Sequence, residues 1–350
     1  MSLQIDGIVF SLQRHGGISV YFRELAACLE RQQAAFTLTL EAPVLQDSIA
    51  RPSNLDLRGA RLLERVRSCR TLPGTTVFHS SYYRRPADGH AANVVTVYDF
   101  IHERFRTGWS RRAFMMQKRS AIRSAQAVIC ISQATRDDLE EWIGTTREQS
   151  VHVIHCGVGR AFRPVPRSAP DRPYVLYVGE RRGYKNFRAV LEAMAWLPDL
   201  ELHCIGGGDL RDEEMHHAPP SVWKRVKHLG FVDDEALNDH YNGAVCLAYP
   251  STYEGFGIPV AEAMRAGCPV VAAASCKAVV EVGGAALTLA DPVDPKSIAE
   301  AILRIIDPAE RATVVQTGLQ IGQAYDWDAQ HQRTLDVYRD LGWRHEKTRA

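Results

Sequence analysis

Short apolar runs alternate with amphipathic segments along the chain, and this alternation begins twice. Strands that alternate with helices form parallel sheets covered by helices. The pattern therefore predicts an α/β protein with two doubly wound domains, whose ligands bind beyond the carboxyl ends of the strands. We expect strands near residues 4–10, 35–40, 75–80, 93–98, 127–131 and 151–155, and a second series near 174–178, 202–205, 226–229, 244–249, 269–273 and 285–289.

Residues 156–173 separate the two series and hold four prolines and four arginines with little periodicity, which is typical of a linker. A length of 350 residues with 45% hydrophobic side chains is enough for two cores, since a domain usually has about 150 residues. We therefore place the domains at residues 1–165 and 166–324. The working site is expected between them.

Composition argues against several classes of protein. No run reaches the roughly 18 apolar residues of a membrane span, and Asp6 interrupts the apolar start that a signal peptide needs, so we expect a soluble, cytoplasmic protein. A net charge of +1 does not indicate a nucleic-acid binder, and eight cysteines without a Cys-x-x-Cys pair argue against zinc. The charge is unevenly distributed, because residues 1–170 hold 23 basic and 15 acidic side chains (+8) and the remainder holds 19 and 26 (−7).

Residues 250–264 form the most informative stretch, a glycine loop and a helix start that follow an apolar strand. Gly255 and Gly257 let the loop backbone approach a ligand and direct its amides inward. Glu254 in the loop and Glu262 in the first helical turn can accept hydrogen bonds from sugar or ribose hydroxyls. Alternatively, both acids only offset the positive charge at the helix N-terminus, an interaction that stabilises the helix by about 0.3 to 1 kcal/mol.

Residues 178–187 form a second constellation, between a strand and a helix start. Arg181, Arg182 and Lys185 crowd a helix N-terminus that carries about half a positive charge, so they repel it unless an anion binds there. A diphosphate is the expected anion. The alternative is a solvated basic turn that is partly balanced by Glu180.

Three further patterns are weaker. Gly16 and Gly17 follow the first strand and either admit a phosphate or an acceptor group or form a plain tight turn. Residues 205–210 suggest a dinucleotide-binding dehydrogenase, but Arg211 stands where its third glycine belongs. Residues 326–328, Asp-Trp-Asp, match a pattern of metal-dependent sugar transferases, but they precede a helix, which favours capping. We therefore expect no metal.

Taken together, the motifs resemble the retaining glycosyltransferases of family four (group 1), in particular bacterial O-antigen and capsule mannosyltransferases. The resemblance implies a GT-B fold, with two Rossmann-like domains facing each other across a cleft and a helix of about 325–350 returning to the first domain. It also implies metal-independent transfer without a cofactor and with retention at the anomeric carbon. The residues that carry it, in the family's order, are Gly16-Gly17, Tyr177-Val-Gly with Lys185-Asn186, Glu254-Gly-Phe-Gly-Ile-Pro-Val-Ala-Glu262 and Gly267-Cys-Pro-Val-Val271.

The resemblance assigns roles to individual residues. Arg181 and Lys185 would hold the diphosphate, and Glu262 the ribose hydroxyls. Glu254 would hold the donor sugar and, with Arg181 and Lys185, belong to the catalytic set. The other donor-binding residues that it implies are Gly16, Gly17, Gly255, the amides of Phe256, Gly257 and Ile258, and the backbone near Phe231 and Val232 for the base.

Two positions depart from the family. Many members have Thr-x-His at the end of a first-domain strand, whereas Tyr98 stands at the His position here. Asp99 and His102 follow and are expected to substitute as catalytic groups. The arginine that often follows the strand-end glycine is Glu180 in this chain, and the nearest arginine is Arg181.

The expected reaction is hexose transfer from a nucleotide diphosphate sugar, best GDP-mannose or a related GDP-sugar, to a glycan or lipid-linked acceptor in surface polysaccharide synthesis. Residues 104–123 interleave seven basic side chains with Phe, Trp and Met, which is typical either of a surface resting on anionic lipid or of an ordinary solvated helix. A nucleotide-sugar epimerase of the same fold and a non-catalytic sugar-binding protein are the alternative functions. An epimerase would convert a nucleotide sugar without an acceptor.

Overall fold

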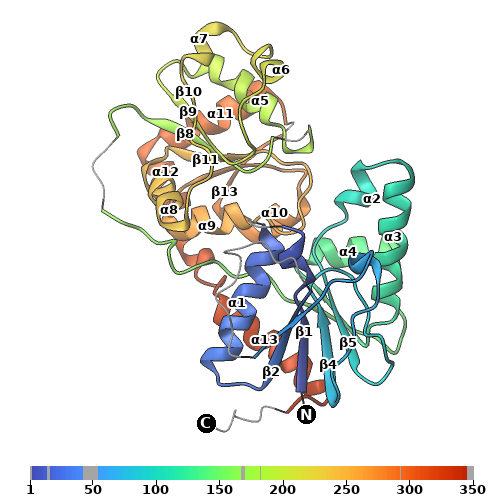
Figure 1. Ribbon diagram of the computed structural model, residues 1–350. Coiled ribbons are helices and arrows are strands. Elements are labelled where there is room, and N and C mark those ends of the chain that lie inside the picture. The colour runs from blue at the N-terminus through green and yellow to red at the C-terminus, as the bar shows by residue number, and fades with distance from the viewer. Residues whose placement is uncertain are drawn as a thin grey trace. The chain divides into compact units, whose positions relative to one another are not determined.

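The computed structural model describes residues 2–13, 16–41, 54–166, 170–181, 183–291 and 293–344. The chain forms two compact units, Met1–Gly157 with Trp327–Ala350 and Val158–Asp326. The divisions fall at 157–158 and 326–327, whereas the sequence suggested 165–166 and 324–325. Each unit holds one parallel sheet with helices, which confirms the two-domain α/β class (Figure 1).

The first unit is built on a parallel sheet in the order β3-β2-β1-β4-β5-β6-β7. Figure 1 shows β2, β1, β4 and β5 side by side, with α3 and α4 beyond β5. The strands are β1 (Ser2–Asp6), β2 (Phe36–Glu41), β3 (Leu55–Arg58), β4 (Thr75–Ser80), β5 (Ala92–Val97), β6 (Ala127–Cys130) and β7 (Ser150–Val153). The helices are α1 (Gly17–Arg31), α2 (Ile101–Phe105), α3 (Gly108–Arg123), α4 (Gln133–Trp142) and α13 (Trp327–Asp340), with short 3-10 helices η1 (Ile8–Ser11) and η2 (Glu64–Val66).

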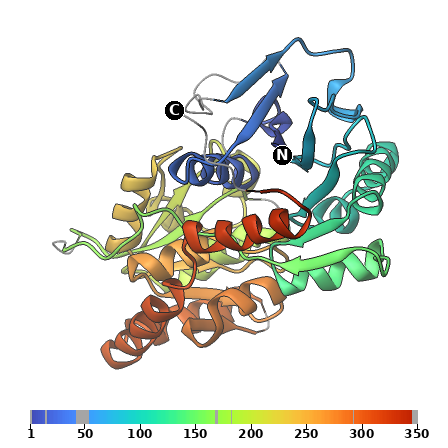
Figure 2. The ribbon, with the colours of Figure 1, turned by 90° about the horizontal axis from the view of Figure 1, so that it is seen from below.

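Helix α13 belongs to the first unit although the whole second unit precedes it in the chain. Figure 2 shows it (red) beside α1 (blue). The Tyr21 ring of α1 lies 5.8 Å from the Trp327 ring and 5.2 Å from the His331 ring. His79 of β4 connects α13 to the sheet, because its Nδ1 lies 2.5 Å from the Tyr338 hydroxyl and its Nε2 lies 2.9 Å from the Thr96 hydroxyl.

The second unit is built on a parallel sheet in the order β10-β9-β8-β11-β12-β13. Its central strands are buried apolar runs, as expected for a sheet covered on both faces. The strands are β8 (Tyr174–Val178), β9 (Glu201–Ile205), β10 (Val226–His228), β11 (Cys246–Tyr249), β12 (Val270–Ala273) and β13 (Leu287–Ala290). The helices are α5 (Phe187–Ala193), α6 (Asp212–Met215), α7 (Pro220–Trp223), α8 (Asp234–Gly243), α9 (Ile258–Ala266), α10 (Lys277–Gly283), α11 (Pro295–Ile306) and α12 (Pro308–Gly322), with 3-10 helices η3 (Gly183–Lys185), η4 (Met194–Trp196) and η5 (Gly284–Ala286).

Two sequence predictions about strands were wrong. The first strand was placed at residues 4–10, but β1 ends at Asp6, whose side chain accepts a hydrogen bond from the Ile8 amide at 3.2 Å. The apolar residues that follow are buried in η1, because burial alone does not distinguish a strand from a short helix. Strand β3 was missed, since this edge strand is only partly buried and has no apolar run. None of the described helices combines the length and apolar content that crossing a lipid bilayer requires.

Candidate functional site

The strand order of the second unit reverses direction between β8 and β11, which are neighbours in the sheet although β9 and β10 lie between them in sequence. In a doubly wound sheet, the loops at the carboxyl ends of two such strands diverge and leave a crevice for a ligand. The described parts of these loops are residues 179–181 and 183–186 after β8 and residues 250–257 after β11. Both were singled out from the sequence, and the topology brings them together.

Hydrogen bonds tie the two loops to each other. The Asn186 side-chain amide donates to the Pro250 carbonyl at 2.8 Å, and the Thr252 amide donates to the Tyr184 carbonyl at 2.9 Å. Asn186 has a φ of 51°, a left-handed conformation that asparagine tolerates better than most residues. The two loops therefore form one structural unit at the edge of the sheet.

Lys185 and Glu254 form an ion pair across these loops. The Lys185 ammonium lies 3.0 Å from the Glu254 carboxylate and 5.6 Å from the centre of the Tyr249 ring. Their side chains are only 15% and 11% exposed, so water screens the two charges less than at an open surface. The pair presents a cation and a carboxylate at one point, where the cation can bind a phosphate and the carboxylate can accept from sugar hydroxyls.

The start of helix α9 lies beside this pair in sequence. Gly257 precedes the helix with a φ of 98°, a conformation that L side chains rarely adopt, and an added Cβ would lie 3.0 Å from Val279. The first turn carries no acidic residue, so its amides keep the partial positive charge of a helix N-terminus. Phe256 anchors the loop, because its buried ring packs 5.5 Å from the Tyr325 ring. The backbone of Gly255, Gly257 and Ile258 is thus held next to Glu254.

Glu262 lies in the second turn of α9, not in the first as the sequence suggested, because the helix begins at Ile258. Its carboxylate accepts a hydrogen bond from the Tyr241 hydroxyl at 3.0 Å. Burial raises the pKa of Glu262 to about 8. A partly buried carboxylate with one hydroxyl partner retains acceptor capacity for a second donor, such as a ribose hydroxyl.

Arg181 points toward the loop after β9. Its guanidinium donates to the carbonyls of Gly206, Gly208 and Asp209 at 3.1, 2.9 and 2.7 Å, and to the Glu214 carboxylate at 2.9 Å. Residues 206–208 are three consecutive glycines with φ of 81°, 76° and 71°, and this turn presents the carbonyls of Gly206 and Gly208 to the arginine. In this arrangement Arg181 holds the glycine loop. Arg182, the other candidate, lies outside the described residues.

Phe231 and Val232 follow β10, next to the same glycine loop. The Gly206 amide donates to the Gly230 carbonyl at 2.8 Å, which fixes the two segments against each other. The Phe231 side chain is 69% exposed. An exposed aromatic ring is suited to contact a flat nucleobase.

The first unit holds the remaining candidates. Gly16 precedes α1 in extended conformation and Gly17 begins the helix. Asp99 follows β5, where its carboxylate accepts from the Ile101 amide at 2.9 Å and its carbonyl accepts from the buried Lys118 ammonium at 2.5 Å. The His102 ring stacks on Phe114 at 4.2 Å, and burial lowers the pKa of this imidazole. Asp99 and His102 are therefore fixed on one short turn.

The Asp-Trp-Asp stretch lies at the start of α13, as expected for a helix N-terminus. Asp328 pairs with Arg31 of α1, and the helix begins at Trp327. Over the described ranges, no three His, Cys, Asp or Glu side chains lie close enough to hold a metal ion.

Comparison with known proteins assigns the family. Residues 15–162 match the family model described as Glycosyltransferase Family 4, and residues 160–317 match the model described as Glycosyl transferases group 1. Together these matches run through both units. The chain belongs to the group 1 glycosyltransferases of family four.

Individual relatives of this family four glycosyltransferase agree with the assignment. The O-antigen chain mannosyltransferase B of Escherichia coli is 33% identical over 178 residues, which are 48% of this chain and 46% of that protein, so the chain spans about half the length of this curated relative. Sucrose-phosphate synthase from Thermosynechococcus elongatus aligns with a TM-score of 0.78 and 22% identity over 97% of this chain and 99% of its own. HepE from Anabaena, solved with UDP-glucose, aligns with a TM-score of 0.72 and 17% identity over 97% of this chain and 100% of its own. The structural likeness confirms the GT-B fold.

Sequence reasoning missed three side chains that contact the expected site residues of this glycosyltransferase. Tyr241 donates to Glu262, Tyr249 lies against Lys185, and Glu214 binds Arg181. Tyr249 could have been found, since it is the last residue of a strand that precedes a glycine loop. Nothing in the local sequence around Tyr241 or Glu214 indicates these contacts, because each partner lies more than 20 residues away.

Proposed function

We propose that this protein transfers a hexose from a nucleotide diphosphate sugar to an acceptor hydroxyl, with retention at the anomeric carbon and without a metal. The observation that carries the proposal is the ion pair of Lys185 and Glu254, which joins the two loops at the β8–β11 switch point beside the start of α9. A diphosphate, a sugar and a ribose can each find a partner of the required chemistry within these two loops and α9.

The transfer needs stabilisation of the departing diphosphate. Lys185 and the amides at the start of α9 provide positive potential there, and a charge at 4 Å is worth about 4 kcal/mol at an effective dielectric constant near 20. Glu254 orients the donor sugar by accepting from its hydroxyls. Because the acceptor attacks from the face that the diphosphate leaves, a phosphate oxygen of the leaving group can take the acceptor proton. Retention follows from this shared face.

In this proposal Arg181 positions the glycine loop of residues 206–208. Glu262 accepts hydrogen bonds from the ribose hydroxyls, and the backbone of residues 231 and 232 contacts the nucleobase. In the first unit, Gly16 and Gly17 are kept as the proposed donor-binding residues, and Asp99 and His102 as the proposed catalytic groups. Their fixed positions on one turn suit this role.

For the donor we propose GDP-mannose or a related GDP-sugar, and for the acceptor a glycan or lipid-linked oligosaccharide of a surface polysaccharide, at the cytoplasmic face of the membrane. The name of the Escherichia coli relative, a mannosyltransferase of the O-antigen chain, supports this choice. HepE was solved with UDP-glucose, so UDP-sugars are the first alternative donors to test against GDP-sugars.

The direct test is turnover of GDP-, UDP-, ADP- and dTDP-sugars by the full chain, with and without glycan acceptors. We expect acceptor-dependent release of the nucleoside diphosphate that is unaffected by EDTA, with a product of unchanged anomeric configuration. Conversion of a nucleotide sugar into its epimer without any acceptor would contradict the proposal.

Lys185→Ala or Glu254→Ala should lower turnover at least about 100-fold while the protein stays folded, because each removes a charge that acts on the transition state. Arg188→Ala is the matched control, since Arg188 forms a comparable but exposed ion pair with Glu192 at 2.6 Å on the neighbouring helix α5. Near-normal turnover of both site variants would refute the assignment.

A further inference from the structure

Two segments of the first unit expose large apolar side chains. One is residues 61–67 around η2, and the other is helix α3. The Leu62 and Trp109 side chains are 82% and 83% exposed, and Leu63, Val66 and Met116 are also exposed. Single exposed apolar residues are common on soluble proteins, but five on two adjoining segments are not.

Contacts show that the two segments adjoin each other. The Gln117 side chain of α3 donates to the Arg65 carbonyl at 2.8 Å. The Arg65 guanidinium lies 5.3 Å from the centre of the Tyr82 ring, which in turn lies 6.0 Å from the Phe114 ring of α3. We call this region the α3 surface and define it by Leu62, Leu63, Arg65, Val66, Arg67, Trp109, Arg112, Met116, Arg119 and Arg123.

Glu64, which lies within residues 61–67, and Glu103, which precedes α3, are turned inward. Glu64 is buried and pairs with Arg61 at 2.6 Å and with Arg84 at 2.9 Å. Helix α3 contains no acidic residue, and Glu103 of α2 is buried in an ion pair with Lys118 at 3.0 Å. Arg104 is excluded from the surface, because Asp138 and Glu141 of α4 offset its charge.

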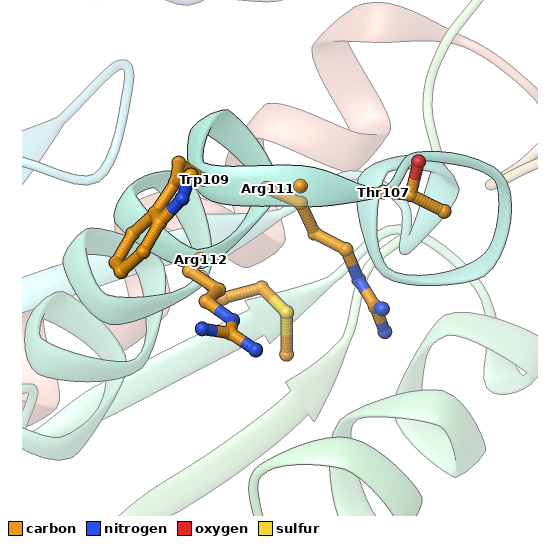
Figure 3. Close-up of a pocket in the computed structure, with 6 residues that line it drawn as sticks. Thr107, Trp109, Arg111 and Arg112 are labelled. Atoms are coloured by element: carbon orange, nitrogen blue, oxygen red, sulfur yellow. The ribbon is translucent and has the colours of Figure 1, made fainter.

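The exposed residues of α3 form a single stripe. Trp109, Arg112, Met116, Arg119 and Arg123 are exposed and follow one another at intervals of three or four residues, which places them on one helix face. The Arg112 guanidinium lies 5.3 Å from the centre of the Trp109 ring. Figure 3 shows Trp109, Arg111 and Arg112 around a hollow at the start of this helix, with both guanidinium groups extending to the same side.

We infer that the α3 surface docks onto an anionic lipid bilayer. Its arginines match the negative potential of anionic headgroups, and its leucines, valine, methionine and tryptophan match the boundary between headgroups and acyl chains. A nucleic-acid backbone would satisfy the arginines, but it offers little apolar contact for Leu62, Leu63 and Met116. The lipid surface is therefore the partner whose chemistry uses both kinds of side chain. This inference concerns the first unit and does not depend on the proposed transfer reaction.

The test is co-sedimentation of the full chain with vesicles of phosphatidylcholine alone or with about one third phosphatidylglycerol. We expect binding to the anionic vesicles that is lost in high salt, since exposed charges are screened within about 10 Å at 0.1 M salt. Each arginine near an anionic surface raises the partition coefficient between vesicles and water about fivefold. The double variant Arg112→Ala with Arg119→Ala should therefore lower this coefficient about 25-fold. Trp109→Ala with Met116→Ala should lower it about tenfold.

Matched controls come from the second unit. Lys224→Ala with Lys296→Ala, and Trp196→Ala with Leu303→Ala, change exposed residues of the same kinds and should alter binding less than twofold. All these positions are exposed, so melting temperatures should not change. Equal binding to neutral vesicles, no vesicle binding, binding to RNA in place of vesicles, or equal effects of the control and α3 variants would each overturn the inference. The shift in melting temperature that nucleotide sugars cause in the same preparations tests the proposed function separately. The membrane inference and the proposed function can therefore fail independently of each other.

Discussion

At the scale of single residues, Glu262 is the proposed partner of the ribose, and ionisation of the same side chain lowers the stability of the folded protein. Its side chain is partly buried, and its pKa is raised to about 8 from an ordinary value of 4.5. The unfolded chain releases this proton at a lower pH than the folded protein does. Stability from the protonated form is therefore complete below pH 4.5 and is lost as pH rises through 8.

Glu262→Gln should raise the free energy of unfolding by about 2 kcal/mol at pH 8 and leave it nearly unchanged at pH 4, because glutamine keeps an acceptor for the Tyr241 hydroxyl without a charge. Denaturant unfolding at the two pH values measures this difference. Glu300→Gln, at an exposed position of α11, is the control and should show no such pH dependence. If the Glu262→Gln variant were less stable than the parent chain at pH 8, the carboxylate would be ionised and well solvated in the folded protein.

The sequence allowed some of these residue contacts to be predicted. Lys185 and Glu254 follow strands whose carboxyl ends meet at one sheet edge, so their proximity follows from topology. The inward direction of Arg181 could not be predicted. It depends on three carbonyl groups that face the guanidinium only when Gly206, Gly207 and Gly208 adopt positive φ.

At the scale of elements, the docking of α13 onto the first unit depends on neutral histidines. His331 stacks on Trp327 at 4.9 Å, and neither of its ring nitrogens has a hydrogen-bond partner among the described residues. Burial lowers the pKa of both His331 and His79 to about 3. Since the unfolded chain binds these protons near pH 6.5, stability present above pH 6.5 is lost as pH falls toward 3.

His331→Phe should raise stability by about 1 to 2 kcal/mol and reduce its fall between pH 6.5 and 3, because the buried unpaired nitrogens are removed while the aromatic stacking is kept. Unfolding at several pH values in this window provides the measurement. His217→Phe, at an exposed position in the second unit, is the matched control and should change neither quantity. If the variant kept the full pH dependence of the parent chain, neutral His331 would not contribute to it.

Elements were predictable where their apolar pattern was continuous and unpredictable where it was not. The central strands β8, β9, β11 and β12 of the second unit follow buried runs and lie close to the predicted positions. Strand β3 at the sheet edge and the 3-10 helix η1 after β1 lack a distinguishing periodicity, so only the tertiary structure defines them.

At the scale of the whole molecule, the chain leaves the first unit at Gly157, completes the second unit and returns at Trp327. The sequence predicted two parallel-sheet domains because apolar runs restart after a proline-rich segment. Ion pairs such as Arg84 with Asp6, Glu41 and Glu64 join four distant parts of the sequence, and no local pattern indicates them.

A crystal structure of the full chain soaked with GDP or UDP would show directly whether the loops after β8 and β11 bind the diphosphate of a nucleotide. We expect the diphosphate within hydrogen-bond distance of the Lys185 ammonium and the amides at the start of α9, with the ribose beside Glu262. A diphosphate bound elsewhere, or Lys185, Glu254 and Glu262 directed away from it, would contradict the proposed site.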